Sequence, residues 1–242
     1  MRQCLNPDCL RPNPDNSQFC QQCGSNLLLV ERYWAKSILG EGGFGRTFLA
    51  VDELKPSKPP CVIKQFLPQA QGTASVTKAS ELFTREAQRL EELGTHSQIP
   101  ALFAYFTHEN RQYLVQEFID GQTLEQELNS NGVYTENQII ELLQDLLSVL
   151  QFVHQNQVIH RDIKPENIIR RTTDKKLVLV DFGAAKYVEL IQKSGLHYAI
   201  LNCDAEAEAT AISPEMVGKA FLDLLQSPED RDRVFNLSSH RR

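Results

Sequence analysis

The chain has 242 residues, 41% of them hydrophobic, and a formal net charge of −6. This length suffices for one sizeable core plus a small appendage, and the mild negative charge argues against a dedicated nucleic-acid binder. No apolar run approaches the roughly 18 residues of a membrane helix, and the first residues lack the apolar stretch of a signal peptide. We therefore expect a cytoplasmic, reducing compartment, in which clustered cysteines indicate metal ligands rather than disulfides.

Four of the six cysteines lie near the N-terminus: Cys4, Cys9, Cys20 and Cys23. The second pair forms a Cys-x-x-Cys turn, and the glycine after it permits the tight backbone that points two thiolates at one ion. The segment has too few apolar side chains to fold by burial alone, so a structural Zn²⁺ held by the four thiolates would supply the missing stability. We expect a zinc ribbon over residues 1–27; a disordered tail that carries cysteines is the alternative.

A glycine run between two predicted strands comes next. The first strand ends at Leu39 and the second covers Thr47–Val51; the spaced glycines between them are Gly40, Gly42 and Gly45. A dinucleotide-binding fold would place a helix directly after such glycines, and a Walker loop would end in Gly-Lys-Ser/Thr, but neither context is present. The pattern suits a hairpin that folds over nucleotide phosphates with Phe44 at its tip. A plain flexible hairpin has the same pattern.

A lysine and a glutamate in the next two predicted elements are expected to pair. Lys64 lies on a predicted strand, Cys61–Phe66, and Glu86 lies on a predicted helix, Ser80–Leu93. Glu86 shares the apolar face of that helix with leucines four residues to either side. Because a carboxylate in an apolar face is costly without a cation, Lys64 is its natural partner. The alternative is a solvated strand lysine.

A long apolar helix, Asn137–Gln155, precedes the most informative run of the chain, His-Arg-Asp-Ile-Lys-Pro-Glu-Asn at residues 160–167. Apolar on more than one side, this helix should be enclosed. In the run, Asp162 can accept a proton from a hydroxyl, Lys164 can steady a migrating phosphoryl group and Asn167 can bind Mg²⁺. A predicted hairpin then leads into Asp-Phe-Gly at residues 181–183.

These motifs, in this order, resemble the eukaryotic-like (Hanks-type) Ser/Thr protein kinases of bacteria over roughly residues 31–186. The resemblance implies an α+β, bilobal protein-kinase-like fold. A β-rich small lobe would cover residues 31–120, followed by part of a helical large lobe over residues 121–190. It also implies phosphoryl transfer from ATP, with Mg²⁺, to the hydroxyls of a protein substrate. The lysine two residues after Asp162 favours Ser/Thr over Tyr substrates.

The resemblance also assigns roles to single residues. The catalytic set consists of the base Asp162 together with Lys164, Lys64 and Glu86. Asn167 and Asp181 would hold Mg²⁺, and His160 and Arg161 would serve as scaffold. The nucleotide-binding residues implied are Leu39, Gly40, Gly42, Gly45, Ala50, Val62, Lys64, Gln116, Glu117, Ile119, Asn167 and Asp181.

Within that set, different residues would contact the adenine in different ways. Leu39, Ala50 and Val62 would line its apolar slot. Gln116 occupies the gatekeeper position, and the backbone of Glu117 and Ile119 would hydrogen-bond the base.

The family pattern stops after Lys186, and residues 191–242 are expected to form a divergent tail. Ser213-Pro214-Glu215 has the form of the family's Ala-Pro-Glu box, but we interpret it as the N-cap and first turn of a helix. We therefore expect a truncated or frameshifted kinase with an incomplete large lobe. The long helix would then expose several leucines as an apolar patch, unless a partner or the tail covers them.

Three functions are compatible with the sequence. A Ser/Thr protein kinase comes first, because the motifs indicate descent. A nucleotide-binding pseudokinase or interaction module comes second, because the nucleotide residues precede Lys186 whereas the substrate platform would be missing. The third is a nonfunctional fragment that barely folds.

Overall fold

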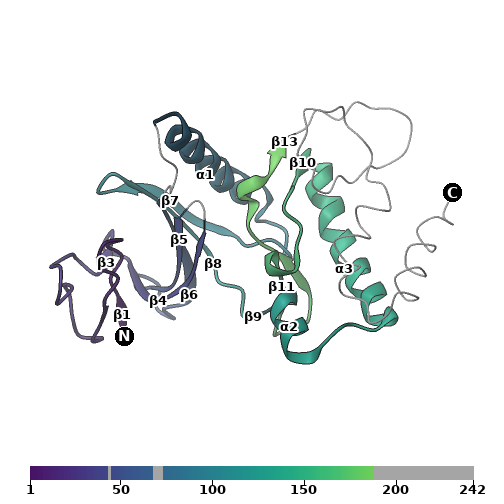
Figure 1. Cartoon of the computed structure of the whole chain (residues 1–242), viewed down its shortest axis with the longest axis horizontal. Helices are drawn as coiled ribbons and strands as arrows, with labels where there is room; N and C mark the ends of the chain where they lie inside the picture. The colour runs from purple at the N-terminus through teal and green to yellow at the C-terminus, as the bar shows by residue number, and fades with distance from the viewer. Residues whose placement is uncertain (43–44, 68–72, 188–242) are drawn as a thin grey trace. The chain divides into compact units, whose positions relative to one another are not determined.

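The computed structural model describes residues 1–42, 45–67 and 73–187 (Figure 1). They form two compact units, one made of Met1–Glu91 with Ala101–Phe118 and the other of Glu92–Pro100 with the chain from Ile119 onward. The hairpin tip at Phe44 and the predicted tail lie outside the described residues. In the described ranges, no helix combines the length and the apolar character needed to span a membrane.

The first unit is built on an antiparallel sheet with the strand order β3-β4-β5-β6-β8-β7. Hairpins join β4 to β5 and β7 to β8, and the second hairpin turns at Glu109 and Asn110, both of which have positive φ. The six strands are β3 (Leu28–Leu29), β4 (Tyr33–Gly42), β5 (Gly45–Asp52), β6 (Pro60–Phe66), β7 (Leu102–His108) and β8 (Arg111–Glu117).

The two faces of this sheet have different covers, because successive side chains of a strand point to opposite sides. We call the side of Lys64 and Phe66 the front face. Helix α1 (Thr73–Leu93) lies on it, and the ring of Phe83 from α1 is 5.3 Å from that of Phe66. On the opposite side, the back face, a fully packed apolar cluster comprises Leu5, Leu29, Tyr33, Ala35, Phe48, Ala50, Cys61, Ile63, Tyr113 and Val115.

The N-terminal segment, residues 1–27, is called the knuckle below. Its short strands β1 (Arg2–Gln3) and β2 (Pro12–Asn13) pair antiparallel. Leu5 belongs to the back-face cluster, and Leu10 packs against it. A second cluster joins Cys4, Cys20 and Leu27 of the knuckle to Trp34 of β4. The knuckle is therefore packed into the first unit.

The second unit combines small sheets with two helices, α2 (Leu124–Asn131) and α3 (Glu136–Gln155). Both helices start at a capping box, in which each side chain accepts the backbone N–H of the other residue; the pairs are Thr123 with Gln126 and Thr135 with Gln138. The remaining elements are β9 (Gly121–Thr123), β10 (Val158–Ile159), η1 (Pro165–Asn167), β11 (Ile168–Arg171), β12 (Leu177–Leu179), η2 (Phe182–Ala184) and β13 (Lys186–Tyr187). The sheets have the orders β12-β11-β9 and β10-β13.

Helix α3 is amphipathic, and this corrects the expectation of an apolar patch on it. The helix contacts β10 and β12. Leu147, 46% exposed, is the only large apolar side chain of α3 that is more than a third exposed. The buried positions recur every three or four residues, so one side of the helix accounts for them: Ile139, Leu142, Leu146, Val149, Leu150 and Val153.

Candidate active site and metal centre

The ion pair expected between Lys64 and Glu86 is present in the first unit. The Lys64 ammonium of β6 donates a hydrogen bond to the Glu86 carboxylate of α1. Glu86 is only 4% exposed, so this ammonium compensates a carboxylate that the protein has taken out of water. The pair thereby ties α1 to the front face of the sheet.

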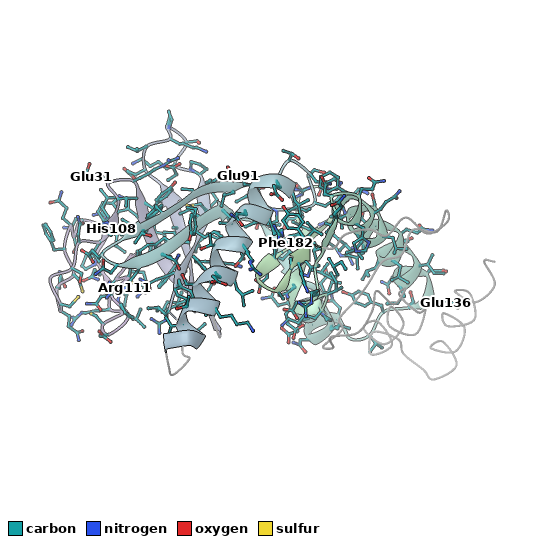
Figure 2. All side chains as sticks on the ribbon, turned by 90° about the horizontal axis from the view of Figure 1, so that it is seen from above. Glu31, Glu91, His108, Arg111, Glu136 and Phe182 are labelled. Atoms are coloured by element: carbon teal, nitrogen blue, oxygen red, sulfur yellow. The ribbon has the colours of Figure 1, made fainter. Side chains whose placement is uncertain are left out.

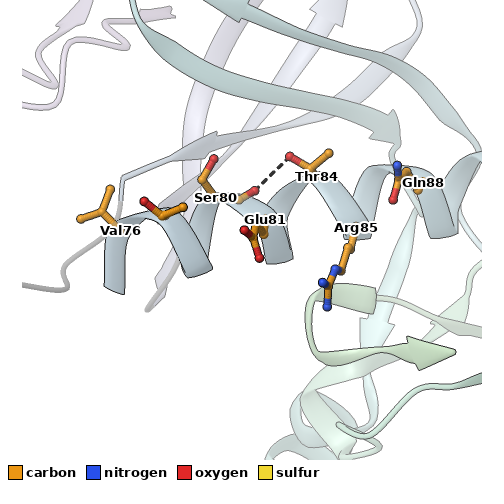
Figure 3. A pocket seen from close by; sticks show the side chains of 7 residues that line it. Val76, Ser80, Glu81, Thr84, Arg85 and Gln88 are labelled. Carbon is orange, nitrogen blue, oxygen red and sulfur yellow. Dashed lines mark hydrogen bonds between the residues drawn. The ribbon is translucent and has the colours of Figure 1, made fainter. Parts of the chain in front are cut away.

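A polar network also attaches α1 to the sheet through Ser80 and Thr84, within the two turns before Glu86. Ser80 Oγ donates to Gln112 Oε1 at 2.8 Å, and Thr84 Oγ1 lies 2.8 Å from Tyr105 Oη. Gln112 Nε2 in turn donates to Tyr105 Oη at 2.9 Å. Figure 3 shows Ser80 and Thr84 on α1, where Thr84 Oγ1 also donates to the Ser80 carbonyl at 3.0 Å; both residues line an open groove along the helix. No local sequence pattern indicates this network, because its contacts between α1 and the sheet join residues 21 to 32 positions apart.

The structure requires glycine at only one of the three predicted positions, Gly40, Gly42 and Gly45. A Cβ on Gly45 would lie 1.9 Å from the Gln65 carbonyl oxygen, and its φ of +148° is one that L side chains rarely adopt. Only glycine therefore lets β5 approach β6 at this point. By contrast, a Cβ on Gly40 or Gly42 would meet no atom of the described part of the chain within 4 Å. Those two glycines have open space above them, which leaves room for a ligand.

The residues expected around adenine do not all lie on one face, and Ala50 is a correction. Ala50 is paired with Cys61 and is buried in the back-face cluster, whereas Val62 lies on the front face with Lys64. Because the side-chain period of a strand is two, Ala50 cannot share a slot with Val62. Thr47, which is paired with Lys64, is the β5 residue on the correct face, and the sequence analysis missed it.

The other adenine candidates differ in exposure and in the unit to which they belong. Gln116 is buried on the front face beside Val62, and its Oε1 has no hydrogen-bond partner among the described residues. The Glu117 N–H donates to the Ala101 carbonyl at 2.9 Å, so a base could use only the Glu117 carbonyl. Leu39 is 49% exposed in the first unit, and Ile119 is buried in the second.

In the second unit, Asp162, Lys164 and Asn167 form one cluster. Lys164 Nζ lies 3.2 Å from Asp162 Oδ2, and Asn167 Nδ2 donates to the same oxygen at 2.8 Å and to the Asp162 carbonyl at 3.0 Å. The hydrogen bond that Lys164 donates to the Asp162 carboxylate raises the pKa of Lys164, and desolvation opposes this only in part. Lys164 therefore remains a cation, and the Asp162 carboxylate is held in one orientation by two donors.

His160 connects this cluster to the Asp-Phe-Gly run, which is the scaffold role expected for it. Its Nδ1 accepts the Asp162 N–H at 3.3 Å, so Nε2 carries the proton that it donates to the Val180 carbonyl at 3.1 Å. The Phe182 ring lies edge-on to the imidazole, with centroids 4.7 Å apart. Arg161 and Asp181 both have left-handed backbones, with φ of 69° and 67°. Such conformations gather where the surrounding structure holds them for a function.

Asn167 and Asp181 offer the ligand atoms that Mg²⁺ prefers. The Asn167 amide nitrogen donates to Asp162, so the amide oxygen is the atom with which Asn167 can bind a cation. The Asp181 carboxylate accepts the Gly183 N–H at 3.4 Å through Oδ1. An amide oxygen and a carboxylate suit a hard cation that keeps other positions for water and phosphate oxygens.

The four knuckle cysteines form a compact sulfur cluster. All four Sγ atoms lie within 4.8 Å of one another, and both Cys4–Cys23 and Cys9–Cys20 have Sγ atoms 3.6 Å apart. Tetrahedral zinc with Zn–S bonds of about 2.3 Å requires sulfurs roughly 3.8 Å apart, so the donor set and its spacing fit Zn²⁺. Gly24, after Cys23, has the expected positive φ of 72°.

Asn13 is a supporting residue of the cluster that the sequence analysis assigned only to a loop. Its side chain is fully buried. It accepts the Gln21 N–H at 2.9 Å, and its Nδ2 lies 3.7 Å from Cys20 Sγ. Contacts of this kind orient metal ligands, but no local sequence pattern distinguishes them from turn chemistry.

Comparison with known proteins assigns the family. The protein kinase domain matches residues 33–220, which is most of the chain. The chain belongs to the protein kinase family. The β-rich sheet of the first unit is the small lobe of this kinase fold. The match includes Ser213-Pro214-Glu215 and extends past Lys186, where the sequence analysis placed the end of the kinase pattern.

Several cyanobacterial serine/threonine-protein kinases are similar to this kinase chain. Serine/threonine-protein kinase B of Synechocystis sp. is 50% identical over 184 residues, which cover 76% of this chain and 32% of the relative. PknA of Nostoc sp. is 48% identical over 160 residues, 66% of this chain and 28% of the relative. Kinase F of Synechocystis sp. is 42% identical over 207 residues, 76% of this chain and 42% of the relative. The chain thus spans less than half the length of these relatives.

Proposed function

We propose that this chain transfers the γ-phosphoryl group of ATP to serine or threonine hydroxyls of a protein substrate. The observation that carries the proposal is the Asp162 carboxylate held between Lys164 and Asn167. The relatives named serine/threonine-protein kinases support the same substrate class. Phosphoryl transfer needs little covalent help from a protein, and positioned charges of this kind supply most of what it needs.

In this proposal the small lobe holds the nucleotide. Lys64, steadied by Glu86, binds the α- and β-phosphates, and Gly40 and Gly42 leave space for the triphosphate. Val62 and Thr47, on the front face, contact the adenosine part of the nucleotide. Asn167 and Asp181 hold Mg²⁺, which neutralises phosphate charge when bound.

The transfer step uses the Asp162 cluster. Asp162 accepts the proton of the substrate hydroxyl while the hydroxyl oxygen forms a bond to the γ-phosphorus. The bond from that phosphorus to its bridging oxygen breaks, and ADP leaves with the electron pair. Lys164 stabilises the negative charge on the migrating phosphoryl group, as preorganised cations do in such transition states.

The test compares labelled phosphate transfer to a generic protein by the wild-type chain and by Asp162→Asn. Loss of a general base should reduce the rate by about 10²–10⁴-fold. Asp174→Asn is the matched control, because Asp174 lies in the same unit and pairs only with Arg171 and the β11–β12 turn. Equal transfer by the wild type and Asp162→Asn would contradict catalysis.

A nucleotide-binding module without transfer is the second candidate, because the supporting contacts described for Lys64, Asn167 and Asp181 are all made with residues before 188. It predicts that ATP with Mg²⁺ raises the melting temperature and that Asp181→Ala removes this rise. Thermal protection together with equal transfer by Asp162→Asn would select this candidate over the kinase.

We also infer that the knuckle holds a structural Zn²⁺ through Cys4, Cys9, Cys20 and Cys23. Four thiolates close the coordination shell, which leaves no open position for chemistry. Elemental analysis of the purified chain should find one zinc per molecule. Cys23→Ser should lower this ratio, whereas Cys61→Ser, which changes a buried cysteine of the back face, should not.

A further inference from the structure

The back face of the small-lobe sheet is closed by the knuckle. Leu5 is a buried member of the back-face cluster, and Leu10 packs against it. The cluster side chains from β4, β5, β6 and β8 are almost completely buried. Burial of each large apolar side chain contributes roughly 1.5–3 kcal/mol relative to exposure. Removing the cover would therefore return part of this core to water.

A buried glutamine links the knuckle to the strand of Lys64. Gln65, the next residue of β6, is 1% exposed. Its Nε2 donates to the Leu5 carbonyl at 2.9 Å and to Tyr113 Oη at 3.0 Å. Leu5 is the residue after Cys4, so the acceptor of the Gln65 hydrogen bond lies next in sequence to a cysteine of the sulfur cluster. If the knuckle leaves, Gln65 Nε2 loses the Leu5 carbonyl as its hydrogen-bond acceptor.

The knuckle also contacts the first unit at Trp34 of β4 and at the β7–β8 hairpin. The Arg2 guanidinium lies 3.4 Å over the ring of Trp34, which also packs against Cys4, Cys20 and Leu27. On the other side, a small pocket of about 130 Å³ is lined by the knuckle and by the β7–β8 hairpin. Figure 2 shows His108 and Arg111, which pair across that hairpin.

We propose that the knuckle is the outer wall of the small lobe, and that the metal on its thiolates maintains the β6 strand on which Lys64 sits. The knuckle has too little apolar area to fold without metal, so its wall exists only while the metal is bound. The metal site and the nucleotide site are then thermodynamically linked through the sheet to which both contribute. This inference rests on the proposed nucleotide-binding role of Lys64.

The experiment uses the full chain, zinc-loaded or treated with a chelator. Three quantities are measured: the melting temperature, the fluorescence of Trp34, which is the only tryptophan, and the affinity for ATP with Mg²⁺ by calorimetry. Chelation should change Trp34 fluorescence, lower the melting temperature by several degrees and weaken ATP binding at least tenfold. Unchanged melting and ATP affinity after a fluorescence change that reports metal loss would overturn the proposal.

Two variants test the link itself. Leu5→Ala should lower the melting temperature of the zinc-loaded chain by roughly 5–15 °C. Gln65→Leu should keep zinc bound yet weaken ATP binding, and chelation should then weaken it less than in the wild type. Phe19→Ala is the matched control, because Phe19 is an apolar knuckle residue that is 58% exposed. If Phe19→Ala and Leu5→Ala behave alike, the wall does not depend on Leu5 and the proposal fails.

The outcomes separate this inference from the proposed function. If the zinc-loaded chain binds no ATP, the role of Lys64 fails, while melting and Trp34 fluorescence still decide whether metal maintains the lobe. If ATP binds equally well with and without metal, the role of Lys64 survives and the inference is overturned.

Discussion

The two faces of the small-lobe sheet are made by the same strands yet carry different chemistry. On the front face, Lys64 and Gln112 meet charged and hydroxyl side chains of α1. On the back face, apolar side chains meet Leu5 and Leu10 of the knuckle, and Gln65 is a buried polar exception. Consecutive residues of β6 therefore face different environments, one on the polar front face and the next on the apolar back face. Front-face substitutions should therefore change ligand binding, and back-face substitutions should change stability.

The largest effect on stability is expected where two strands approach most closely. Gly45→Ala would place a methyl group against the Gln65 carbonyl at a strained φ and should cost roughly 3 kcal/mol or more. Chemical denaturation measures the loss. Gly40→Ala is the control, because open space surrounds that Cβ position and the change should stay within about 0.5 kcal/mol. Similar losses for both variants would show that the close approach is not the cause.

The front face is tested by Lys64→Met, which removes the ammonium and keeps much of the side-chain volume. Phosphoryl transfer should fall by about 10²–10³-fold, as when one preorganised electrostatic group is lost. Because Glu86 then stays buried without this ammonium, the melting temperature without nucleotide should also fall. Lys58→Met, at an exposed turn lysine paired with Glu53, should transfer phosphate like the wild type. A strong loss of transfer in Lys58→Met would mean that the assay reports general damage.

The assignment of Ala50 to the back face can be tested by enlarging it. Ala50→Val overpacks the cluster and should destabilise the chain by about 1–3 kcal/mol while leaving the choice between ATP and GTP unchanged. Thr47→Val, on the front face, should change nucleotide affinity more than stability. If Ala50→Val altered nucleotide selectivity in a stably folded chain, the separation of the two faces would be wrong.

The smallest expected effect concerns the polar network that attaches α1. Tyr105→Phe removes the hydroxyl shared by Thr84 and Gln112 and should cost about 0.5–1.5 kcal/mol. Because the network lies on the helix of Glu86, ATP affinity should fall slightly in the same variant. Tyr187→Phe, in the other unit, provides a tyrosine control for ATP affinity. An unchanged stability in Tyr105→Phe would mean that water replaces the hydroxyl without loss.

Sequence reasoning succeeded where the signal is local or where a charge needs a partner. The cysteine spacing predicted the sulfur cluster, and the apolar stripe around Glu86 predicted its pairing with Lys64. Element limits were less accurate: α1 begins at Thr73, seven residues before the predicted start. The capping box of Thr123 and Gln126 that begins α2 was readable in the sequence but was not used.

The errors concern contacts that depend on register or on distant segments. Ala50 was placed by resemblance, and only the pairing with Cys61 reveals its face. Leu5 looked like an isolated apolar residue of a polar segment, because the cluster that it completes comes from strands further along the chain. The expected patch on α3 was wrong because helical periodicity, rather than the number of leucines, decides what is exposed.

The matched kinase domain begins at residue 33, the first residue of β4. The hydrophobic core of the small lobe nevertheless includes Leu5 and Leu29, which precede it. A shortened protein that starts at this limit would lack Leu5 and Leu29 and would open an apolar sheet surface to solvent. Such a fragment should be recovered mainly as aggregate, although every recognised kinase motif remains in it. Here the border suggested by family similarity and the border of the folding unit differ by some thirty residues.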